Sequence, residues 1–390
     1  MTGGEPQVRP DQAPQISNIV ILMKENHSFD NYFGMLGRGD GFTLDAGGVP
    51  TNTNPDKSGK EVRVHHLSLP FNPSLGLSNT WNDSHLQWNG GQMDGFVTTT
   101  DSDDPMGYLD GGDLPWYYGF AKTFGIGDRY FSSCLAMTFP NRRYLQAATS
   151  DGLVATTLPS PFIHPPKTGL IWDRLDQAGI SWANYFVEVP EVSLWPRNTL
   201  RYHEHLHPIT EFFEDCESGR LPAVSLVTPD IPFTSEGEFE DNQVGEAFTA
   251  TVFDALTAGP QWARTLFILT WDEGGGFYDH VPPPAAVAPD DVPPDIHVPS
   301  DQPGGFDRYG FRVPCLVASP YSKPGHVSSV IYDHTSILAA IEQKWGLAPL
   351  TRRDAAAAAL WDFLDLSAEP AFLHPPQLPR PTIWPFTGHR

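Results

Sequence analysis

The fold is decided at one junction, where Ile16-Ser-Asn-Ile-Val-Ile-Leu-Met23 runs straight into Lys24-Glu-Asn-His-Ser-Phe-Asp-Asn-Tyr-Phe-Gly34. An apolar run of this length, rich in β-branched residues, is typical of a strand covered on both faces, as in a parallel sheet with helices on either side. Open α/β sheets bind ligands just beyond the carboxyl ends of their strands, so Glu25 and Asn26 are expected at a site. Their oxygen atoms suit a hard metal cation; alternatively, both residues only cap or turn the chain.

A second junction repeats this pattern. Residues 265–271 form an apolar run that ends in Asp272-Glu-Gly-Gly-Gly-Phe-Tyr-Asp-His280. Adjacent carboxylates repel each other unless a cation compensates their charge, so Asp272 and Glu273 are further candidates for metal ligands. The glycines beside them allow the backbone to turn sharply or to approach a ligand closely. The alternative is an acidic turn between strand and loop.

A helix is expected to begin within Met137-Thr-Phe-Pro-Asn-Arg-Arg-Tyr-Leu145. Proline favours the first turn of a helix, and Thr138 stands just before it, near the N-cap. Helix N-termini bind phosphate through free N–H groups and the helix dipole. A nucleophilic Thr138 would therefore meet a bound phosphoryl group there. The alternative is a threonine that only caps the helix.

The rest of the chain alternates predicted helices and strands. The helices span residues 114–123, 169–179, 244–257 and 332–346, and the strands span residues 180–186, 221–228, 265–271 and 311–319. Such alternation indicates an α/β fold, a doubly wound and mostly parallel central sheet with helices on both faces. We expect a flexible segment over residues 1–15, a single domain with loop insertions over 16–350, and a short helix with a proline-rich tail over 351–390.

Composition narrows the class of protein. The chain has 24 Lys and Arg against 47 Asp and Glu, a formal charge of −23, which argues against a nucleic-acid partner and an electrostatic membrane anchor. Three cysteines are too few for a disulfide framework. No apolar run is long enough to span a membrane, and the first fifteen residues lack the pattern of a signal peptide. We expect a soluble chain, either cytoplasmic or the mature form of an exported protein.

Taken together, five motifs resemble the bacterial and plant non-specific phospholipase C and acid phosphatase family, which belongs to the alkaline phosphatase superfamily. Their order and spacing match over roughly residues 16 to 346. They are the segments 24–34, 89–96, 138–142, 272–282 and 333–336, which read Lys-Glu-Asn-His-Ser-Phe-Asp-Asn-Tyr-Phe-Gly, Asn-Gly-Gly-Gln-Met-Asp-Gly-Phe, Thr-Phe-Pro-Asn-Arg, Asp-Glu-Gly-Gly-Gly-Phe-Tyr-Asp-His-Val-Pro and Asp-His-Thr-Ser.

The resemblance implies a phosphoesterase with an alkaline phosphatase-like fold and a covalent phosphothreonine intermediate on Thr138. It implies one divalent metal ion, held by Glu25, Asn26, Thr138, Asp272 and Glu273. Asn26, His85 and His205 are implied to bind the phosphate group, and one of the two histidines is expected to act as a catalytic acid. Asn141, His280 and His334 are expected to support these residues. Relatives generally carry a histidine where this chain has Gly237, so Glu236, Glu238 or a water on the metal ion are the other candidates for the acid.

The predicted function is metal-dependent hydrolysis of phosphate esters, phospholipase C-like on the head-group phosphodiesters of phospholipids. The alternatives are a broad-specificity acid phosphatase and a non-catalytic phosphate- or metal-binding protein. The presence of Thr138 and all four metal ligands argues against the non-catalytic protein. An apolar approach for acyl chains is one interpretation of Trp81, Trp88, Trp116, Tyr117 and Tyr118, and burial in the core is the other. The sequence predicts no oligomeric state.

Overall fold

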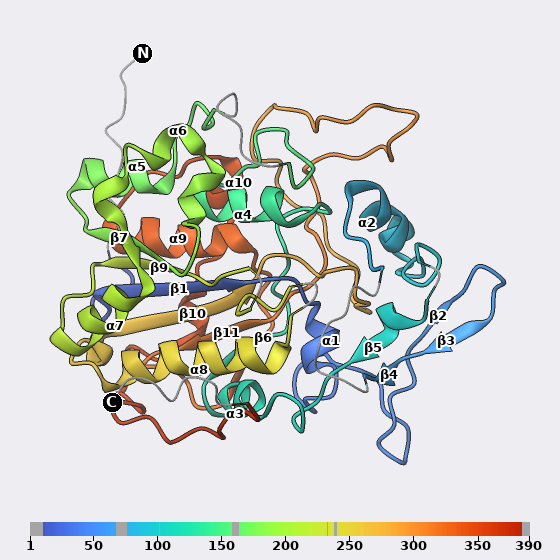
Figure 1. Ribbon diagram of the computed structural model, residues 1–390, viewed down its shortest axis with the longest axis horizontal. Coiled ribbons are helices and arrows are strands. Elements are labelled where there is room, and N and C mark those ends of the chain that lie inside the picture. Colours follow the sequence, from blue (N-terminus) through green and yellow to red (C-terminus); the bar gives the residue numbers. More distant parts are fainter. Residues whose placement is uncertain are drawn as a thin grey trace.

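The computed structural model describes residues 11–67, 76–100, 102–157, 164–231, 233–237 and 240–383. An eight-stranded sheet crosses the protein in the order β12-β6-β11-β10-β1-β9-β7-β8 (Figure 1). Its strands are β1 (Asn18–Lys24), β6 (Gly125–Gly127), β7 (Trp182–Phe186), β8 (Leu206–Pro208), β9 (Val224–Thr228), β10 (Thr265–Trp271), β11 (Cys315–Ala318) and β12 (His326–Ser328).

The centre of this sheet is parallel. β1 pairs with β10 on one side and with β9 on the other, and its register with β10 runs from Asn18 opposite Thr265 to Lys24 opposite Trp271. All residues of β1 and β10 are buried, as their continuous apolar sequences predict. β7 and β8 extend the parallel part, whereas β11 runs antiparallel to β10 and β6. The prediction of a mostly parallel α/β sheet is confirmed.

Helices cover both faces of the sheet (Figure 1). On one face lie α4 (Thr138–Ala147), α5 (Ile171–Ala178) and α9 (His334–Trp345), and on the other lie α3 (Pro115–Thr123) and α8 (Asn242–Ala258). Gly179 and Gly346 end α5 and α9 in the left-handed conformation that glycine favours, with φ of 68° and 65°. Further α-helices among the described residues are α1 (Phe29–Phe33), α2 (Trp81–Trp88), α6 (Pro196–Thr199), α7 (Ile209–Ser218) and α10 (Arg352–Ala356).

Smaller elements gather beyond the carboxyl ends of β1 and β10, where Figure 1 shows α1, α2 and two short strand pairs. The pairs are β2 (Thr53–Pro55) with β3 (Glu61–Arg63), and β4 (His65–His66) with β5 (Gly107–Tyr108). Residues 281–305 form no helix or named strand. The insertions therefore build up the edge of the sheet at which the site was predicted.

Several sequence-based expectations differ from the structure. The strand predicted over residues 311–319 is shorter, at Cys315–Ala318. Residues 11–15 are not a free segment, because Ala13 is fully buried and the Lys344 ammonium donates a hydrogen bond of 2.9 Å to its carbonyl oxygen. The proline-rich tail contributes to the core, since Phe372 is buried against Phe124 at a ring distance of 4.7 Å. Residues 1–10 and 384–390 lie outside the described residues.

The aromatic residues considered for an apolar approach belong to the interior. Trp81, Trp116, Tyr117 and Tyr118 are all buried, and the last three lie in the main hydrophobic core. Trp88 is partly buried against a smaller cluster. The core interpretation is therefore the right one for four of the five. Within the described part of the chain, no helix combines the length and the apolar character that crossing a membrane requires.

Candidate active site

The two strand ends place four predicted ligands side by side. Glu25 and Asn26 follow β1, Asp272 and Glu273 follow β10, and the backbone N–H of Asp272 donates to the carbonyl of Lys24 at 3.1 Å. All four side chains are buried, and that of Asn26 hydrogen-bonds to Glu273. The parallel register of β1 and β10 therefore produces this grouping directly.

Thr138 lies at the same place. It is the first residue of α4, and the N-cap is Met137, whose side chain makes no capping hydrogen bond. The hydroxyl Oγ1 of Thr138 instead faces the carboxylate Oε1 of Glu273 at 3.5 Å. The alternative of a purely capping threonine is therefore wrong, because this hydroxyl is directed at a predicted metal ligand.

Asn141 fixes the turn that presents Thr138. Its side-chain oxygen accepts hydrogen bonds from the backbone N–H groups of Ser133 and Cys134 at 2.8 and 3.0 Å. Its amide nitrogen donates to the carbonyl groups of Ala136 and Met137 at 2.8 and 3.1 Å. A single fully buried side chain thus holds the segment that leads into the helix.

Arg142 is the residue that sequence reasoning missed. Its guanidinium donates to Asp272 at 2.8 Å and to Glu191 at 2.8 Å, and it lies 3.5 Å from Glu25. The signal was present in the sequence, because residues four apart share one face of a helix and Arg142 follows Thr138 by four. The arginine therefore ties α4, which carries Thr138, to the ends of both strands that precede these carboxylates.

The electrostatics favour a cation at these carboxylates. Burial, reinforced by the charge of Asp272, raises the pKa of Glu25 to about 8. Burial likewise raises the pKa of Asp272 to about 8 and that of Glu273 to about 7, and a neighbouring carboxylate adds to each shift. Their carboxylate oxygens, with the amide of Asn26 and the hydroxyl of Thr138, are the donors that hard divalent cations take. The residues therefore fit one divalent metal ion.

Two other groups of described residues bring three candidate ligand atoms within 4.8 Å of one another. In the first, Asp30 and Asp279 both accept hydrogen bonds from Arg312, at 2.9 and 2.8 Å. In the second, His66 is exposed and pairs with Asp113 at 2.7 Å, and Asp110 and Asp113 are partly buried. Glu25, Asp272 and Glu273 form no such group, so their carboxylate oxygens do not all lie within 4.8 Å of one another. We prefer them because they lie beside Thr138. The members of the two groups are Asp30, Asp279 and His280, and His66, Asp110 and Asp113.

We expect metal binding to strengthen as the pH rises from about 5 to about 8. The folded-state pKa values of Glu25 and Asp272, about 8, exceed the ordinary carboxyl values, so the metal-free fold loses stability as the pH rises through that range. A divalent cation needs the ionised forms, and it restores that stability. The measurement is the Tm of chelator-treated protein with and without excess Mn²⁺, Mg²⁺ or Ca²⁺ across this range. A metal-induced Tm shift that is independent of pH would contradict the assignment.

Two of the predicted supporting histidines hold the strand ends. The Nε2–H of His334 donates to the carbonyl oxygen of Asp272 at 2.7 Å, and burial lowers the pKa of this histidine to about 4, so the ring is neutral. His280 binds Asp30 at 2.6 Å; burial alone would lower its pKa, but the carboxylate of Asp30 raises it to about 8. His280 thereby joins the loop after β10 to α1, away from Thr138.

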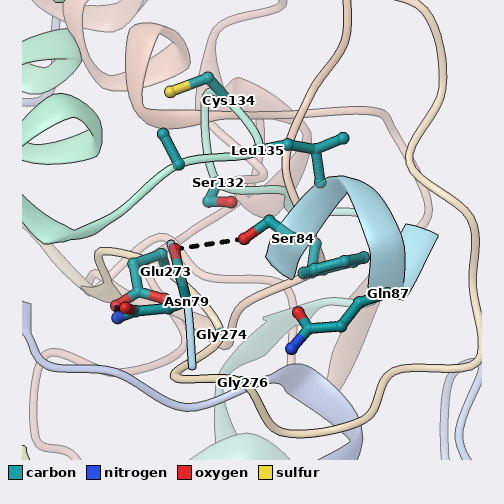
Figure 2. A pocket seen from close by; sticks show the side chains of 11 residues that line it. Asn79, Ser84, Gln87, Ser132, Cys134, Leu135, Glu273, Gly274 and Gly276 are labelled. Carbon is teal, nitrogen blue, oxygen red and sulfur yellow. Dashed lines mark hydrogen bonds between the residues drawn. The ribbon is translucent and has the colours of Figure 1, made fainter. Parts of the chain in front are cut away.

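A water-sized niche lies at the site, with Glu273 in its wall. The niche has a volume of about 10 Å³ and is lined by Asn79, Ser84, Gln87 and Glu273, among others (Figure 2). The Nδ1–H of His85 donates to the carbonyl of Trp81 at 2.7 Å, and its Nε2 faces Gly304 so closely that a Cβ there would collide with it. His85 does not line the niche itself, so its role as a phosphate ligand stays a prediction.

The placement of His205 at the site is wrong. Its ring stacks on Trp182 with a centroid distance of 4.1 Å, and its Nε2 lies 3.3 Å from Asp176. Trp182 is the first residue of β7, and His205 directly precedes the parallel strand β8. The histidine therefore lies at the amino ends of these strands, opposite the edge that carries Glu25 and Asp272.

Gly237 does lie in the site. A Cβ at this position would stand 3.4 Å from Oε2 of Glu25 and 3.5 Å from Oγ of Ser235. Its neighbour Glu236 is fully buried and bound by four donors, so it has no proton to give to a leaving group. The donors are Lys24, Tyr32, Tyr117 and Trp271. Glu238, the other carboxyl considered, lies outside the described residues.

We expect Glu236→Gln to lower the free energy of unfolding by about 3–5 kcal/mol, because the substitution leaves the buried ammonium of Lys24 without its carboxylate, which stands 3.1 Å away. Urea unfolding measures this loss. Glu204→Gln is the matched control, since the Glu204 side chain is 84% exposed. Equal stability of the two variants would show that the ion pair between Lys24 and Glu236 does not stabilise the fold.

Comparison with known proteins decides the family. Residues 16–348 match the phosphoesterase family. The chain belongs to that family. Among phosphoesterase relatives, Phospholipase C A of Mycobacterium tuberculosis is 33% identical over 390 residues, covering 87% of this chain and 74% of the relative. Non-specific phospholipase C4 of Arabidopsis thaliana is 33% identical over 382 residues, covering 87% and 70%. The family resemblance read from the motifs is thereby confirmed.

Other matches are more partial. The non-hemolytic phospholipase C of Pseudomonas aeruginosa is 30% identical over 378 residues, which cover 85% of this chain and 54% of the relative. The chain thus spans about half the length of this relative and of the hemolytic phospholipase C from the same organism. A further match is the solved structure of a protein in the alkaline phosphatase superfamily from Vibrio parahaemolyticus. The match covers 92% of this chain and 76% of the Vibrio chain, at 10% identity and a TM-score of 0.41.

Proposed function

We propose that this phosphoesterase hydrolyses the head-group phosphodiester of phospholipids, as a phospholipase C does, through a phosphothreonine intermediate. The names of the relatives support the substrate class. The observation that carries the proposal is the hydroxyl of Thr138, 3.5 Å from Oε1 of Glu273 at the start of α4, beside the carboxylates that Arg142 joins.

Each of these residues has its own role in the proposed reaction. Oγ1 of Thr138 loses its proton and forms a bond to phosphorus while the bond from phosphorus to the alcohol oxygen breaks, and that oxygen takes up a proton. Water then loses a proton and bonds to phosphorus, the bond from phosphorus to Oγ1 breaks, and Oγ1 takes up a proton. A divalent metal ion held by Glu25, Asn26, Asp272, Glu273 and Thr138 would supply positive charge against the phosphoryl oxygens and lower the pKa of the hydroxyl. Arg142 and Asn141 hold the nucleophile and the carboxylates in fixed positions relative to one another.

One substrate panel tests the proposal. We expect cleavage of phosphatidylcholine and para-nitrophenyl phosphorylcholine to exceed that of para-nitrophenyl phosphate, and a chelator to abolish all three activities. Preference for the monoester would make the protein a phosphatase of the same family. No hydrolysis of any of the three with metal present would leave a binding protein and contradict the proposal.

Substituting Gly237 tests the missing proton donor. The distances from its Cβ position to Glu25 and Ser235 are ordinary contacts, so a side chain can be added there. We expect Gly237→His to raise the ratio of alkyl-ester to para-nitrophenyl-ester hydrolysis at least about tenfold, because only the alkyl alcohol needs a proton to depart. Gly237→Phe, similar in size but without an ionisable group, is the control. An equal ratio in the two variants would show that this position does not face the leaving group.

A further inference from the structure

A pocket of about 240 Å³ opens beside the candidate active site. Glu25 and Arg142 stand in its wall, and so does Phe139, the residue after Thr138. The other walls come from the segment after β7, residues 188–194, and from the segment that begins at the last residue of β9, residues 228–231. The two segments are adjacent because the backbone N–H of Val187 donates to the carbonyl of Thr228 at 3.2 Å.

Most polar side chains in this wall are already engaged within the protein. Arg142 binds Glu191 and lies beside Glu25, and the hydroxyl of Ser235 donates to Glu240 at 2.7 Å. The hydroxyl of Thr228 accepts from the amide of Asn184 at 2.9 Å, and Asp230 accepts from the hydroxyl of Thr234. The surface offered to a ligand is therefore mainly the apolar one, formed by Phe139, Val189, Pro190, Leu194, Pro229 and Ile231.

The apolar surface continues out to solvent at the pocket mouth. Val189 and Ile231 line the pocket and are 55% and 58% exposed. Phe233, on the same segment as Ile231, is 65% exposed. Large apolar side chains gathered at the mouth of a pocket mark a surface that binds an apolar partner. A volume of about 240 Å³ is slightly below the roughly 300–1,000 Å³ of pockets that enclose a whole drug-sized ligand, so part of a longer ligand would lie outside.

We propose that this pocket binds the glyceride part of a phospholipid, with the acyl chains leaving it past Val189, Ile231 and Phe233. The inference rests on the proposed function, because the glyceride is the alcohol that such a reaction releases. Continuity with the site supports this occupant, since the wall that holds Glu25 and Arg142 also holds the residue next to Thr138. The apolar end of the substrate thus lies in the pocket, apart from its head group.

The test is calorimetric binding of 1,2-dihexanoyl-sn-glycerol to the full chain and to three variants. We expect the wild type to bind, and Val189→Asp and Ile231→Asp each to weaken binding at least about fivefold, because each removes apolar contact area and adds a charge. Val49→Asp is the matched control: Val49 is 49% exposed and does not line the pocket. Phosphatidylcholine and para-nitrophenyl phosphorylcholine serve as the hydrolysis pair, and we expect the two pocket variants to lose more rate on the lipid.

The outcomes separate this proposal from the proposed function. Absence of glyceride binding by the wild type, or equal affinity of all three variants, would overturn the pocket assignment. The assignment would also be overturned if the two pocket variants bound phosphorylcholine more weakly than the wild type but bound the glyceride equally well. The pocket would then take the head group, near the exposed Glu188. Glyceride binding lost in the two pocket variants, with no hydrolysis of either ester by the wild type, would support the pocket and refute the phospholipase activity.

Discussion

Thr138→Ala is expected to lower kcat by about 10⁴-fold or more while the protein stays folded. The substitution removes the only group proposed to bond to phosphorus. The hydroxyl makes one long contact, 3.5 Å to Glu273, so its loss is expected to change the free energy of unfolding by less than about 1 kcal/mol. Steady-state kinetics on para-nitrophenyl phosphorylcholine and urea unfolding measure the two quantities.

Thr138→Ser and a remote threonine provide the controls. Thr138→Ser keeps a hydroxyl and should retain measurable turnover. Thr168→Ala changes an exposed threonine and should leave the rate unchanged. Near wild-type kcat in Thr138→Ala would contradict the covalent mechanism, and equal loss in Thr138→Ala and Thr138→Ser would point to a defect of packing.

Asp272→Asn is expected to weaken divalent metal binding by about 100-fold or more, since substitutions even of groups that only support metal ligands cost about 10–100-fold. The change removes a full charge from a fully buried side chain, whose pKa is raised mainly by burial and further by the charge of Glu273. Activity should fall in parallel and return in part at high metal concentration. Elemental analysis after dialysis and titration with Mn²⁺ measure the affinity.

Glu25→Gln should behave in the same way, because its carboxylate lies across Arg142 from Asp272. Asp291→Asn is the control, since the side chain of Asp291 is 95% exposed on the loop insertion. Unchanged metal stoichiometry and affinity in both Asp272→Asn and Glu25→Gln would place the cation elsewhere, with the group of Asp30, Asp279 and His280 as the next candidate.

The central strands and their carboxylates were predictable because long buried runs leave few alternatives. β10 spans the predicted residues 265–271, and the parallel register with β1 then brings Asp272 next to the end of β1. Thr138 was predictable because Pro140 marks the first turn of α4. Chain direction was harder to predict, since the four-residue strand β11 carries no sequence signal that it runs antiparallel.

The position of His205 and the partners of Glu236 could not be predicted from the sequence. The family resemblance implied His205, but a resemblance of motifs cannot tell at which end of a strand a residue lies, and Trp182 and Asp176 hold this ring at the opposite edge of the sheet. Glu236 presents the opposite case. It was a candidate acid because of its position beside Gly237, and only the folded structure reveals that Lys24 and three aromatic side chains occupy its carboxylate.

The most direct test of the account is to trap the intermediate. Protein mixed with para-nitrophenyl phosphorylcholine and quenched in acid within the first turnover should carry one phosphorylcholine group on the peptide that contains Thr138, identified by mass spectrometry. The same experiment on Thr138→Ala should give no adduct. A modified residue other than Thr138, or full turnover with neither an adduct nor a burst of para-nitrophenolate, would contradict the account.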